Sequence, residues 1–206
     1  MKRILVTGGT GYIGSHTCIS LLEKGYDVTI VDNLVNSKAL VVDRIENLSG
    51  KKVKFFEADV CDEDALRKIF AEDEIFAVIH FAGLKAVGES VQIPLRYYEN
   101  NLISTLSLLK VMAEFKVNNF VFSSSATVYG NPASVPIRED FPLSTTNPYG
   151  TKALGEPPAC SGAPAIRNAI LNATGIGIDV APITPHVLFA AFEKAGLFEK
   201  EETAHV

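Results

Sequence analysis

The chain has 206 residues, 47% of them apolar, and its 24 acidic residues outnumber its 19 lysines and arginines. This apolar share is ample for a buried core, and a net charge of -5 without a basic face argues against general binding of nucleic acid. No apolar run approaches the roughly 18 residues of a membrane span, so we expect a cytoplasmic protein without a membrane partner. The scattered Cys18, Cys61 and Cys160 predict reduced thiols rather than disulfides or a metal site.

The first 24 residues predict a strand, a tight turn and a helix. Apolar residues between Lys2 and Thr7 lead into Gly8, Gly11 and Gly14, and apolar positions at helical spacing follow. Gly8 permits the sharp turn, Gly11 lets the backbone approach a pyrophosphate, and Gly14 lets the helix pack close to the strand. The helix start offers free N–H groups to phosphates. We therefore expect a dinucleotide-binding turn, with a glycine-rich turn that binds no ligand as the alternative.

A second strand is expected from Tyr26 to Val31, with Asp32 at its end. A carboxylate in this position accepts hydrogen bonds from an adenosine ribose. The turn that follows lies at the sheet edge where nucleotides bind, so we expect it to cover the adenosine. It consists of Asn33, Leu34, Val35, Asn36 and Ser37.

Helices and strands continue to alternate along the rest of the chain up to residue 124. We expect a helix over 39–48 closed by Gly50, a strand over 52–58, a helix from the cap Asp62 to Phe70, a strand over 75–81, a helix over 97–116 and a strand over 119–124. This order predicts an α/β fold with a doubly wound parallel sheet. His80 lies among apolar neighbours and is interpreted as a core histidine rather than a catalytic one.

The expected chemistry lies at one edge of that sheet, where Asp32, Asp59 and Ser125 arrive with residues 81–85. Beyond Ser125 the chain reaches Tyr149 at the start of a further helix. A tyrosine can act as general acid and base if positive charge lowers its pKa, and a serine hydroxyl can polarise the same substrate oxygen. A packing tyrosine and a structural hydroxyl are the alternatives for these two residues.

Several motifs of residues 1 to about 151 resemble the UDP-glucose 4-epimerases, which are extended short-chain dehydrogenases/reductases. Besides the glycine turn, the resemblance rests on Asp32-Asn-Leu, Asp59-Val60, Phe81-Ala-Gly-Leu-Lys-Ala-Val-Gly-Glu-Ser90, Ser123-Ser-Ser-Ala-Thr-Val-Tyr-Gly130 and Asn147-Pro-Tyr-Gly150. It implies NAD as cofactor, a UDP-sugar as substrate and a possible homodimer.

The resemblance also implies roles for single residues. NAD would lie on Tyr12 and Ile13 and on the turn from Asp32 to Ser37, with its adenine against Asp59 and Val60. The pyrophosphate and nicotinamide-ribose side would be lined by Phe81, Ala82, Gly83, Leu84, Lys85 and Asn100. In the family, the residue matching Tyr149 removes the sugar 4-hydroxyl proton and the residue matching Ser125 holds that hydroxyl. For Lys85 a solvated loop charge is the alternative.

The match to the epimerases changes directly after Tyr149. Their pattern is Tyr-x-x-x-Lys, but here Lys152 stands at +3 and Ala153 at +4, a rotation of roughly 100° on a helix. Residues 152–206 instead resemble the C-terminal end of molybdenum hydroxylases, with Glu156 matching their general base. The molybdopterin-binding part is missing, so Glu156 is interpreted as an orphan carboxylate.

The sequence therefore predicts a dinucleotide-binding domain over 1–151 and an atypical tail over 152–206 that forms no complete substrate domain. We expect NAD-dependent interconversion of UDP-glucose and UDP-galactose, impaired in this chain. The alternatives are a non-catalytic NAD-binding module, and another nucleotide-sugar dehydratase or reductase of the same superfamily.

Overall fold

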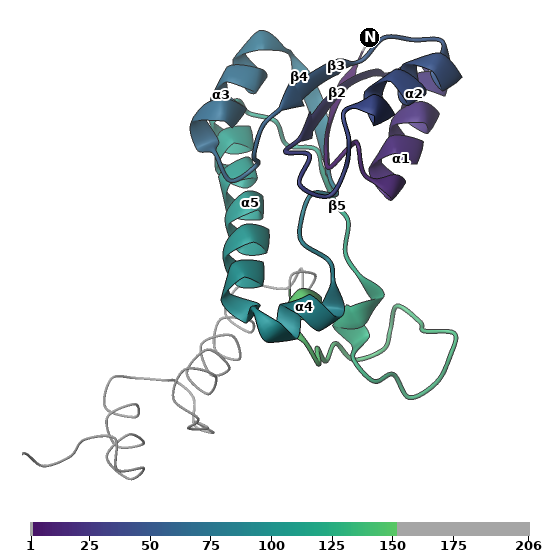
Figure 1. The fold of residues 1–206 in the computed structure, drawn as a ribbon, viewed down its shortest axis with the longest axis vertical. Helices are drawn as coiled ribbons and strands as arrows, with labels where there is room; N and C mark the ends of the chain where they lie inside the picture. Colours follow the sequence, from purple (N-terminus) through teal and green to yellow (C-terminus); the bar gives the residue numbers. More distant parts are fainter. Residues whose placement is uncertain (1, 152–206) are drawn as a thin grey trace, which may run out of the picture. The chain divides into compact units, whose positions relative to one another are not determined.

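The computed structural model describes residues 2–151, which lie in a compact unit spanning Met1–Ala153. Five parallel strands form one sheet in the order β3-β2-β1-β4-β5 (Figure 1). They are β1 (Arg3–Thr7), β2 (Asp27–Asp32), β3 (Lys54–Glu57), β4 (Ile75–His80) and β5 (Phe120–Phe122). The parallel, doubly wound sheet predicted from the sequence is confirmed. The predicted tail, including Glu156 and Cys160, lies outside the described residues.

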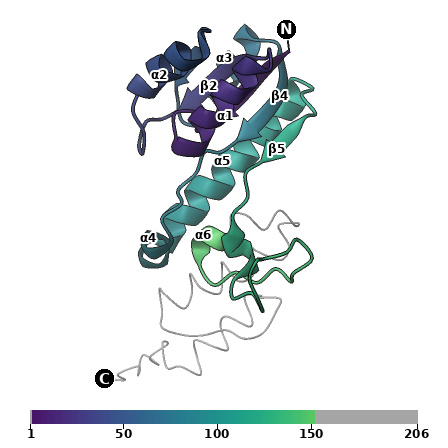
Figure 2. The ribbon, with the colours of Figure 1, turned by 90° about the vertical axis from the view of Figure 1, so that its right-hand side faces the viewer.

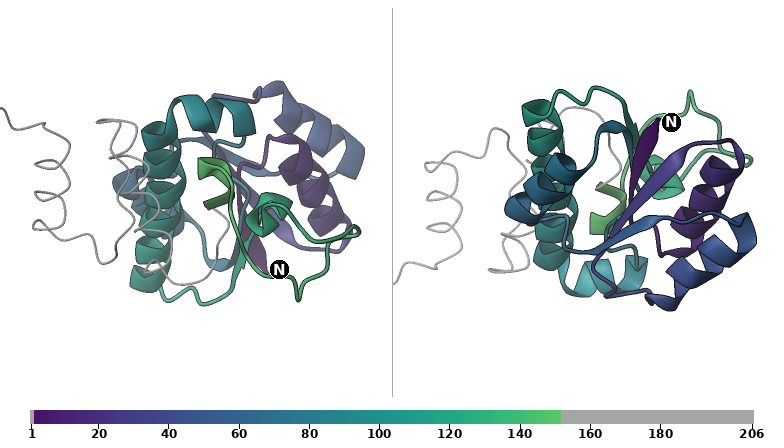
Figure 3. Two further views of the ribbon diagram at one scale, coloured as in Figure 1. Left: turned by 90° about the horizontal axis from the view of Figure 1, so that it is seen from below. Right: turned by 90° about the horizontal axis from the view of Figure 1, so that it is seen from above.

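Helices cover both faces of the sheet (Figures 2 and 3). Helices α1 (Tyr12–Glu23) and α2 (Leu40–Ser49) pack together on one face, and α3 (Glu63–Glu72) and α5 (Pro94–Glu114) on the other. Three short helices complete the described chain: α4 (Val87–Gln92), η1 (Ala126–Tyr129) and α6 (Pro148–Thr151). Within residues 2–151, no helix is long and apolar enough to cross a membrane.

Alternating strand residues build a core on each face. Leu5 and Val78 join the cluster that includes Leu108 of α5, whereas Val6 and Ile30 join the cluster under α1 and α2. Because neighbouring side chains of a strand point to opposite faces, one buried strand supports both layers.

Local signals explain where several helices begin and end. The carboxylate of Asp62 accepts hydrogen bonds from the N–H groups of Asp64 and Ala65, both at 3.0 Å, as the predicted cap requires. Gly50 ends α2 with φ of 66°, a conformation that suits glycine. Helix α5 starts at Pro94, earlier than the predicted Tyr97, because proline fits the first turn of a helix where its missing N–H costs nothing.

The register brings the carboxyl ends of the central strands level with one another. Thr7 at the end of β1 pairs with Val31 of β2 and with His80 of β4. The loops that leave these strands therefore start side by side, at the edge of the sheet where ligands bind in this architecture.

Candidate functional site: a cavity at the carboxyl edge of the sheet

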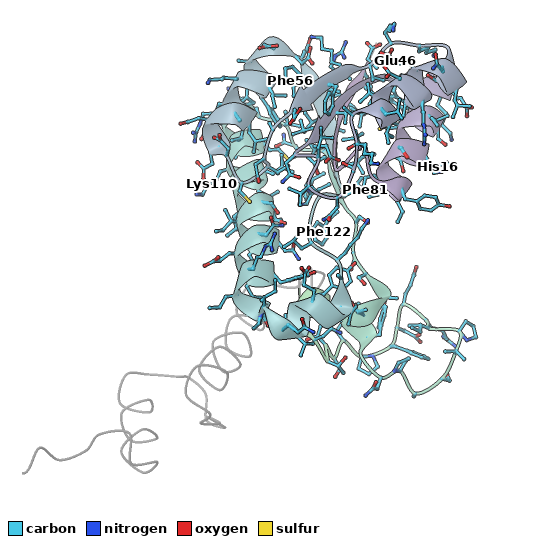
Figure 4. All side chains as sticks on the ribbon, in the orientation of Figure 1. His16, Glu46, Phe56, Phe81, Lys110 and Phe122 are labelled. Atoms are coloured by element: carbon cyan, nitrogen blue, oxygen red, sulfur yellow. The ribbon has the colours of Figure 1, made fainter. Side chains whose placement is uncertain are left out.

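A cavity of about 380 Å³ lies at the carboxyl edge of the sheet, and we call it the edge cavity. Its walls come from the glycine turn, the loops after β2, β3 and β4, and one face of α5. It is lined by Gly8, Gly11, Tyr12, Asp32, Asn33, Val35, Asn36, Ser37, Ala58, Asp59, Val60, Phe81, Ala82, Gly83, Leu84, Lys85, Arg96, Asn100 and Ser104. Phe81, which directly follows β4, is labelled in Figure 4.

Two glycines of the turn, Gly8 and Gly14, have no room for a side chain. A Cβ on Gly8, whose φ is 68°, would lie 2.7 Å from the backbone nitrogen of Ala82, and one on Gly14 would lie 2.2 Å from the carbonyl oxygen of Gly8. Gly11 precedes α1, and no side chain among the described residues caps the first N–H groups of that helix. The first turn of α1 therefore presents N–H donors without a side-chain cap beside the edge cavity, which suits an anionic group.

Asp32 is only 8% exposed, and its carboxylate accepts hydrogen bonds on both oxygens. Oδ1 accepts hydrogen bonds from the N–H of Leu34 and the hydroxyl of Ser37, each at 3.0 Å. Oδ2 accepts one from the N–H of Thr10 at 3.2 Å. A carboxylate can accept about four hydrogen bonds, so Asp32 keeps acceptor capacity toward a ligand hydroxyl in the cavity.

Asp59 forms the next part of the wall. Its carboxylate accepts hydrogen bonds from the N–H of Cys61 at 2.8 Å and from the side chain of Asn33 at 3.1 Å. Burial alone would raise the pKa of Asp59, but these hydrogen bonds prevail and lower it. Burial and the nearby Asp59 charge raise the pKa of Cys61 to about 12, so this thiol is protonated at neutral pH and is a poor nucleophile.

Three side chains of α5 line the cavity at intervals of four residues: Arg96, Asn100 and Ser104. Only Asn100 was expected from the sequence. The four-residue spacing places all three on one face of the helix, so extending the pattern from Asn100 in both directions would have found the other two.

His80 is fully buried and joins two elements, as expected for a core histidine. Its Nδ1 lies 2.6 Å from the hydroxyl of Thr7, and its Nε2 lies 3.2 Å from the hydroxyl of Thr105 in α5. The Thr7 hydroxyl also accepts a hydrogen bond from the N–H of Ala82 at 3.3 Å. The imidazole thus supports the start of the loop after β4 without lining the cavity.

Other residues expected at the site do not line the edge cavity: Ile13, Gly14, Leu34, Ser125 and Tyr149. The Ser125 hydroxyl accepts a hydrogen bond from the N–H of Thr127 at 3.2 Å and so caps η1. The N–H of Gly150, next to Tyr149, donates to Asn147 at 2.8 Å. Helices η1 and α6 contact each other, so the segments that carry Ser125 and Tyr149 are neighbours.

Side chains that could hold a metal ion do not gather in the described part of the chain. Residues 2–151 contain no group of three or more His, Cys, Asp or Glu suited to that purpose.

Known proteins resemble this chain over the region that builds the cavity. The family model described as GDP-mannose 4,6 dehydratase matches residues 5–156. The UDP-glucose 4-epimerase of Schizosaccharomyces pombe is 61% identical over 155 residues, and that of Bacillus subtilis is 59% identical over 151. Each alignment covers 73% of this chain and 44% of the relative, so the chain spans less than half the length of these curated relatives.

Solved structures of UDP-glucose 4-epimerases also resemble this chain. The UDP-glucose 4-epimerase of Bifidobacterium longum in complex with NAD+ and UDP superposes with a TM-score of 0.73 at 50% identity, covering 84% of this chain and 50% of that one. The family match covers more than half of the chain. The chain therefore belongs to the family of extended short-chain dehydrogenases/reductases that this model describes. Over about its first 150 residues, the relatives that it resembles are UDP-glucose 4-epimerases.

Proposed function

We propose that residues 2–151 form the NAD-binding domain of a UDP-glucose 4-epimerase type of protein. The observation that carries this proposal is the convergence of the glycine turn, Asp32 and Asp59 on one cavity. The relative from Bifidobacterium longum, solved with NAD+ and UDP, supports the choice of ligand.

In this proposal the residues of the cavity share the work of holding NAD. The free N–H groups after Gly11 bind the pyrophosphate, and the remaining acceptor capacity of Asp32 binds the adenosine ribose. Asp59 and Val60 flank the adenine. The far end of the cofactor lies against Phe81, Ala82, Gly83, Leu84, Lys85 and Asn100.

When bound, NAD would accept the hydride, and residues of the chain would move the proton. Tyr149 would take the proton of the sugar 4-hydroxyl, while the hydroxyl of Ser125 would hold that oxygen. A UDP-sugar is the proposed substrate, and UDP-glucose and UDP-galactose are the proposed pair. Because Lys152 stands at +3 from Tyr149 rather than at +4, we propose that this activity is impaired.

A non-catalytic NAD-binding module is the second candidate. It is favoured by one observation: neither Ser125 nor Tyr149 lines the edge cavity, although the expected cofactor residues of the loops do. Binding of NAD without conversion of the sugar would distinguish this candidate from the first.

A homodimer is also proposed. Apolar side chains lie exposed along one face of α5, and a second copy of the chain could cover them. They are Leu95, Leu102, Leu106 and Leu109. Sedimentation at several concentrations tests this association. A cytoplasmic location and the lack of a nucleic-acid partner remain predictions from composition.

Calorimetric titration with NAD tests the binding proposal, and strand β2 offers a matched control because it has an aspartate at each end. We expect saturable binding that weakens at least about tenfold in Asp32→Ala, where the ribose loses a charged acceptor. Asp27→Ala, at the other end of the same strand, should bind like the unchanged protein. Folded protein that does not bind NAD, or binds it equally well without Asp32, would refute the proposal.

A further inference from the structure

A second hollow lies between α1 and α2, beside the edge cavity, and we call it the α1–α2 groove. Its volume is about 540 Å³. The two helices pack together on one face of the sheet (Figure 3), and the glycine turn and the loop after β2 form one end of the groove. Gly11 and Ser37 lie between the two hollows, because they line both.

Apolar side chains from both helices line this groove. Helix α1 contributes Ile19, and α2 contributes Leu40, Val41, Ile45 and Leu48. Ile45 is buried and forms the floor, whereas Leu40 and Leu48 are 53% and 73% exposed. Covering two exposed leucines removes apolar surface from water, which favours association with another molecule.

The charged side chains of the groove are basic. Lys38 and Arg44 line it, His16 adds a positive charge when protonated, and no carboxylate is among the described residues of the lining, although the chain has a net charge of -5. The ion pairs found within residues 2–151 include neither Lys38 nor Arg44. Glu46 of α2, labelled with His16 in Figure 4, pairs with Lys52 and does not line the groove. The groove therefore suits an occupant with negative charge.

The shape of the groove suits a helix. Its walls are two helices that pack side by side, and a third helix can lie in the valley between two others. On α2 the lining extends from Leu40 to Leu48, which is roughly 12 Å or about two helical turns. On α1 the rings of Tyr12 and His16 lie 5.1 Å apart, edge to face. Tyrosine and arginine are enriched among residues that dominate protein–protein binding, so Tyr12 and Arg44 suit a protein partner.

We propose that the α1–α2 groove is a docking site for an amphipathic helix of a partner protein. The apolar stripe of that helix covers Leu40, Ile45 and Leu48. Acidic residues beside the stripe face Lys38 and Arg44. The inference goes beyond the proposed binding of NAD and does not rest on it, because these five residues do not line the edge cavity.

The test uses two synthetic helical peptides of about 15 residues, or roughly four helical turns. Both carry the same stripe of leucines, flanked by glutamates in one peptide and by lysines in the other. Fluorescence anisotropy of the labelled peptides measures their affinity for the full chain and for its variants. Arg44→Glu reverses one charge of the groove, and Leu48→Ala shortens its apolar stripe. Lys68→Glu is the matched control, because it changes the net charge equally but lies exposed in α3, on the other face of the sheet.

We expect the glutamate peptide to bind the unchanged chain at least about tenfold more tightly than the lysine peptide, with a preference that shrinks at high salt. Arg44→Glu should weaken binding of the glutamate peptide at least about tenfold and strengthen binding of the lysine peptide. Leu48→Ala should weaken binding of both peptides about threefold to tenfold, because apolar contact is lost. Lys68→Glu should keep both affinities within about twofold.

Several results would overturn the inference. They are a folded chain that does not bind the glutamate peptide, equal affinities for the two peptides, and equal effects of Arg44→Glu and Lys68→Glu, which would reveal attraction by net charge alone. Binding to phosphatidylserine vesicles without binding of the peptide would also overturn it and would indicate a membrane surface instead. If the unchanged chain does not bind NAD, the proposed function fails, while the peptide affinities still decide this inference.

Discussion

The hydroxyl of Ser37 donates a hydrogen bond to Oδ1 of Asp32 at 3.0 Å and lies 2.7 Å from the hydroxyl of Thr10. These contacts connect the loop after β2 to the glycine turn across the Asp32 carboxylate. Because the carboxylate is also held by the N–H groups of Thr10 and Leu34, it cannot turn away from a ligand without breaking several hydrogen bonds. The negative charge therefore stays where the adenosine ribose is proposed to bind.

A fixed charge at this place should discriminate between the two dinucleotides. The 2′-phosphate of NADP would approach the Asp32 carboxylate, and two negative charges at close range repel each other. We expect NADP to bind at least about tenfold more weakly than NAD in competition titrations. Asp32→Asn removes the charge but keeps the shape of the side chain, so it should bring the affinities for NAD and NADP closer together. Equal affinities for NAD and NADP in the unchanged protein would contradict the assigned ribose position.

Two glycines should respond in opposite ways to the same added methyl group. A Cβ on Gly14 would lie 2.2 Å from the carbonyl oxygen of Gly8, which belongs to the backbone of the turn and cannot move aside cheaply. We expect Gly14→Ala to lower the free energy of unfolding by about 1–3 kcal/mol and to weaken NAD binding.

Gly88 is the control, because a Cβ there would meet no atom within 4 Å and the residue lies in helix α4. Gly88→Ala should raise the free energy of unfolding by about 0.5–1 kcal/mol, since alanine loses less conformational freedom in a helix than glycine does. Urea unfolding measures both variants. A tolerated Gly14→Ala would mean that the turn can relax around a side chain.

The sequence was sufficient to predict the central strands and the helices around them, because apolar runs, glycines and capping aspartates are local signals. Asp62 and Gly50 are examples: each acts on residues within its own helix. The residues that order the cavity wall were not predicted. The partners of Asn101 and Tyr97 lie in a loop 11 to 17 positions earlier, so nothing in the local pattern distinguishes these residues from other polar positions of α5.

Helix α4 was missed for a related reason. It spans Val87–Gln92 and begins with a valine and a glycine, which are weak helix formers. A helix of this length is marginal by itself, and the hydrogen bond from Tyr97 to Glu89 ties it to α5. The element therefore depends on a tertiary contact that periodicity cannot indicate.

Asp73 should make stability depend on pH at the opposite edge of the sheet. Its buried carboxylate accepts hydrogen bonds from Thr29, at 2.8 Å, and from Lys54, and Arg3 lies 3.6 Å away. Burial alone would raise the pKa of Asp73, but these hydrogen bonds and the two positive charges prevail and hold it below the ordinary value of 3.8. The carboxylate is thus more stable as an anion in the folded state than in the unfolded chain.

This contribution is fully present above the unfolded-state pKa and is lost as the pH falls through the lower folded-state value. At pH 7 we expect Asp73→Asn to reduce the free energy of unfolding by about 1–3 kcal/mol, and the difference from the unchanged protein should shrink below about pH 4. Urea unfolding of both proteins between pH 7 and pH 3 measures this difference in the free energy of unfolding. Asp140→Asn is the control, because Asp140 pairs with Arg138 at an exposed site and should matter by less than about 0.5 kcal/mol. A difference independent of pH would show that the Asp73 charge is not responsible.

The residues around Tyr149 should determine whether the chain epimerises a UDP-sugar. Epimerisation needs hydride transfer, a tyrosine of lowered pKa and a sugar that can present either face. The edge cavity, where NAD is proposed to bind, supports the first requirement, hydride transfer. In the sequence, Lys152 stands at +3 from Tyr149 rather than at the +4 position of the family pattern, so we expect the second requirement to be met less well.

We expect the third requirement to depend on the residues from Lys152 onward, for which the sequence predicts an atypical tail rather than a complete substrate domain. Oriented binding contributes roughly 7–11 kcal/mol to such a step, so its loss should outweigh the shifted lysine. We expect conversion of UDP-galactose to UDP-glucose, followed in a coupled assay beside the Bacillus subtilis relative, to be very low or absent. Tyr149→Phe should then change little, because little activity remains to be lost.

Inserting one residue between Thr151 and Lys152 restores the +4 spacing and separates the two defects. We expect this insertion not to restore conversion, because it repairs the charge near Tyr149 without supplying oriented binding of the sugar. The NAD affinity of the inserted chain, measured by calorimetry, should equal that of the unchanged chain and controls for folding. Recovery of turnover by the insertion alone would identify the lysine spacing as the only defect. Robust turnover without it would show that the residues after Lys152 do form a sugar pocket.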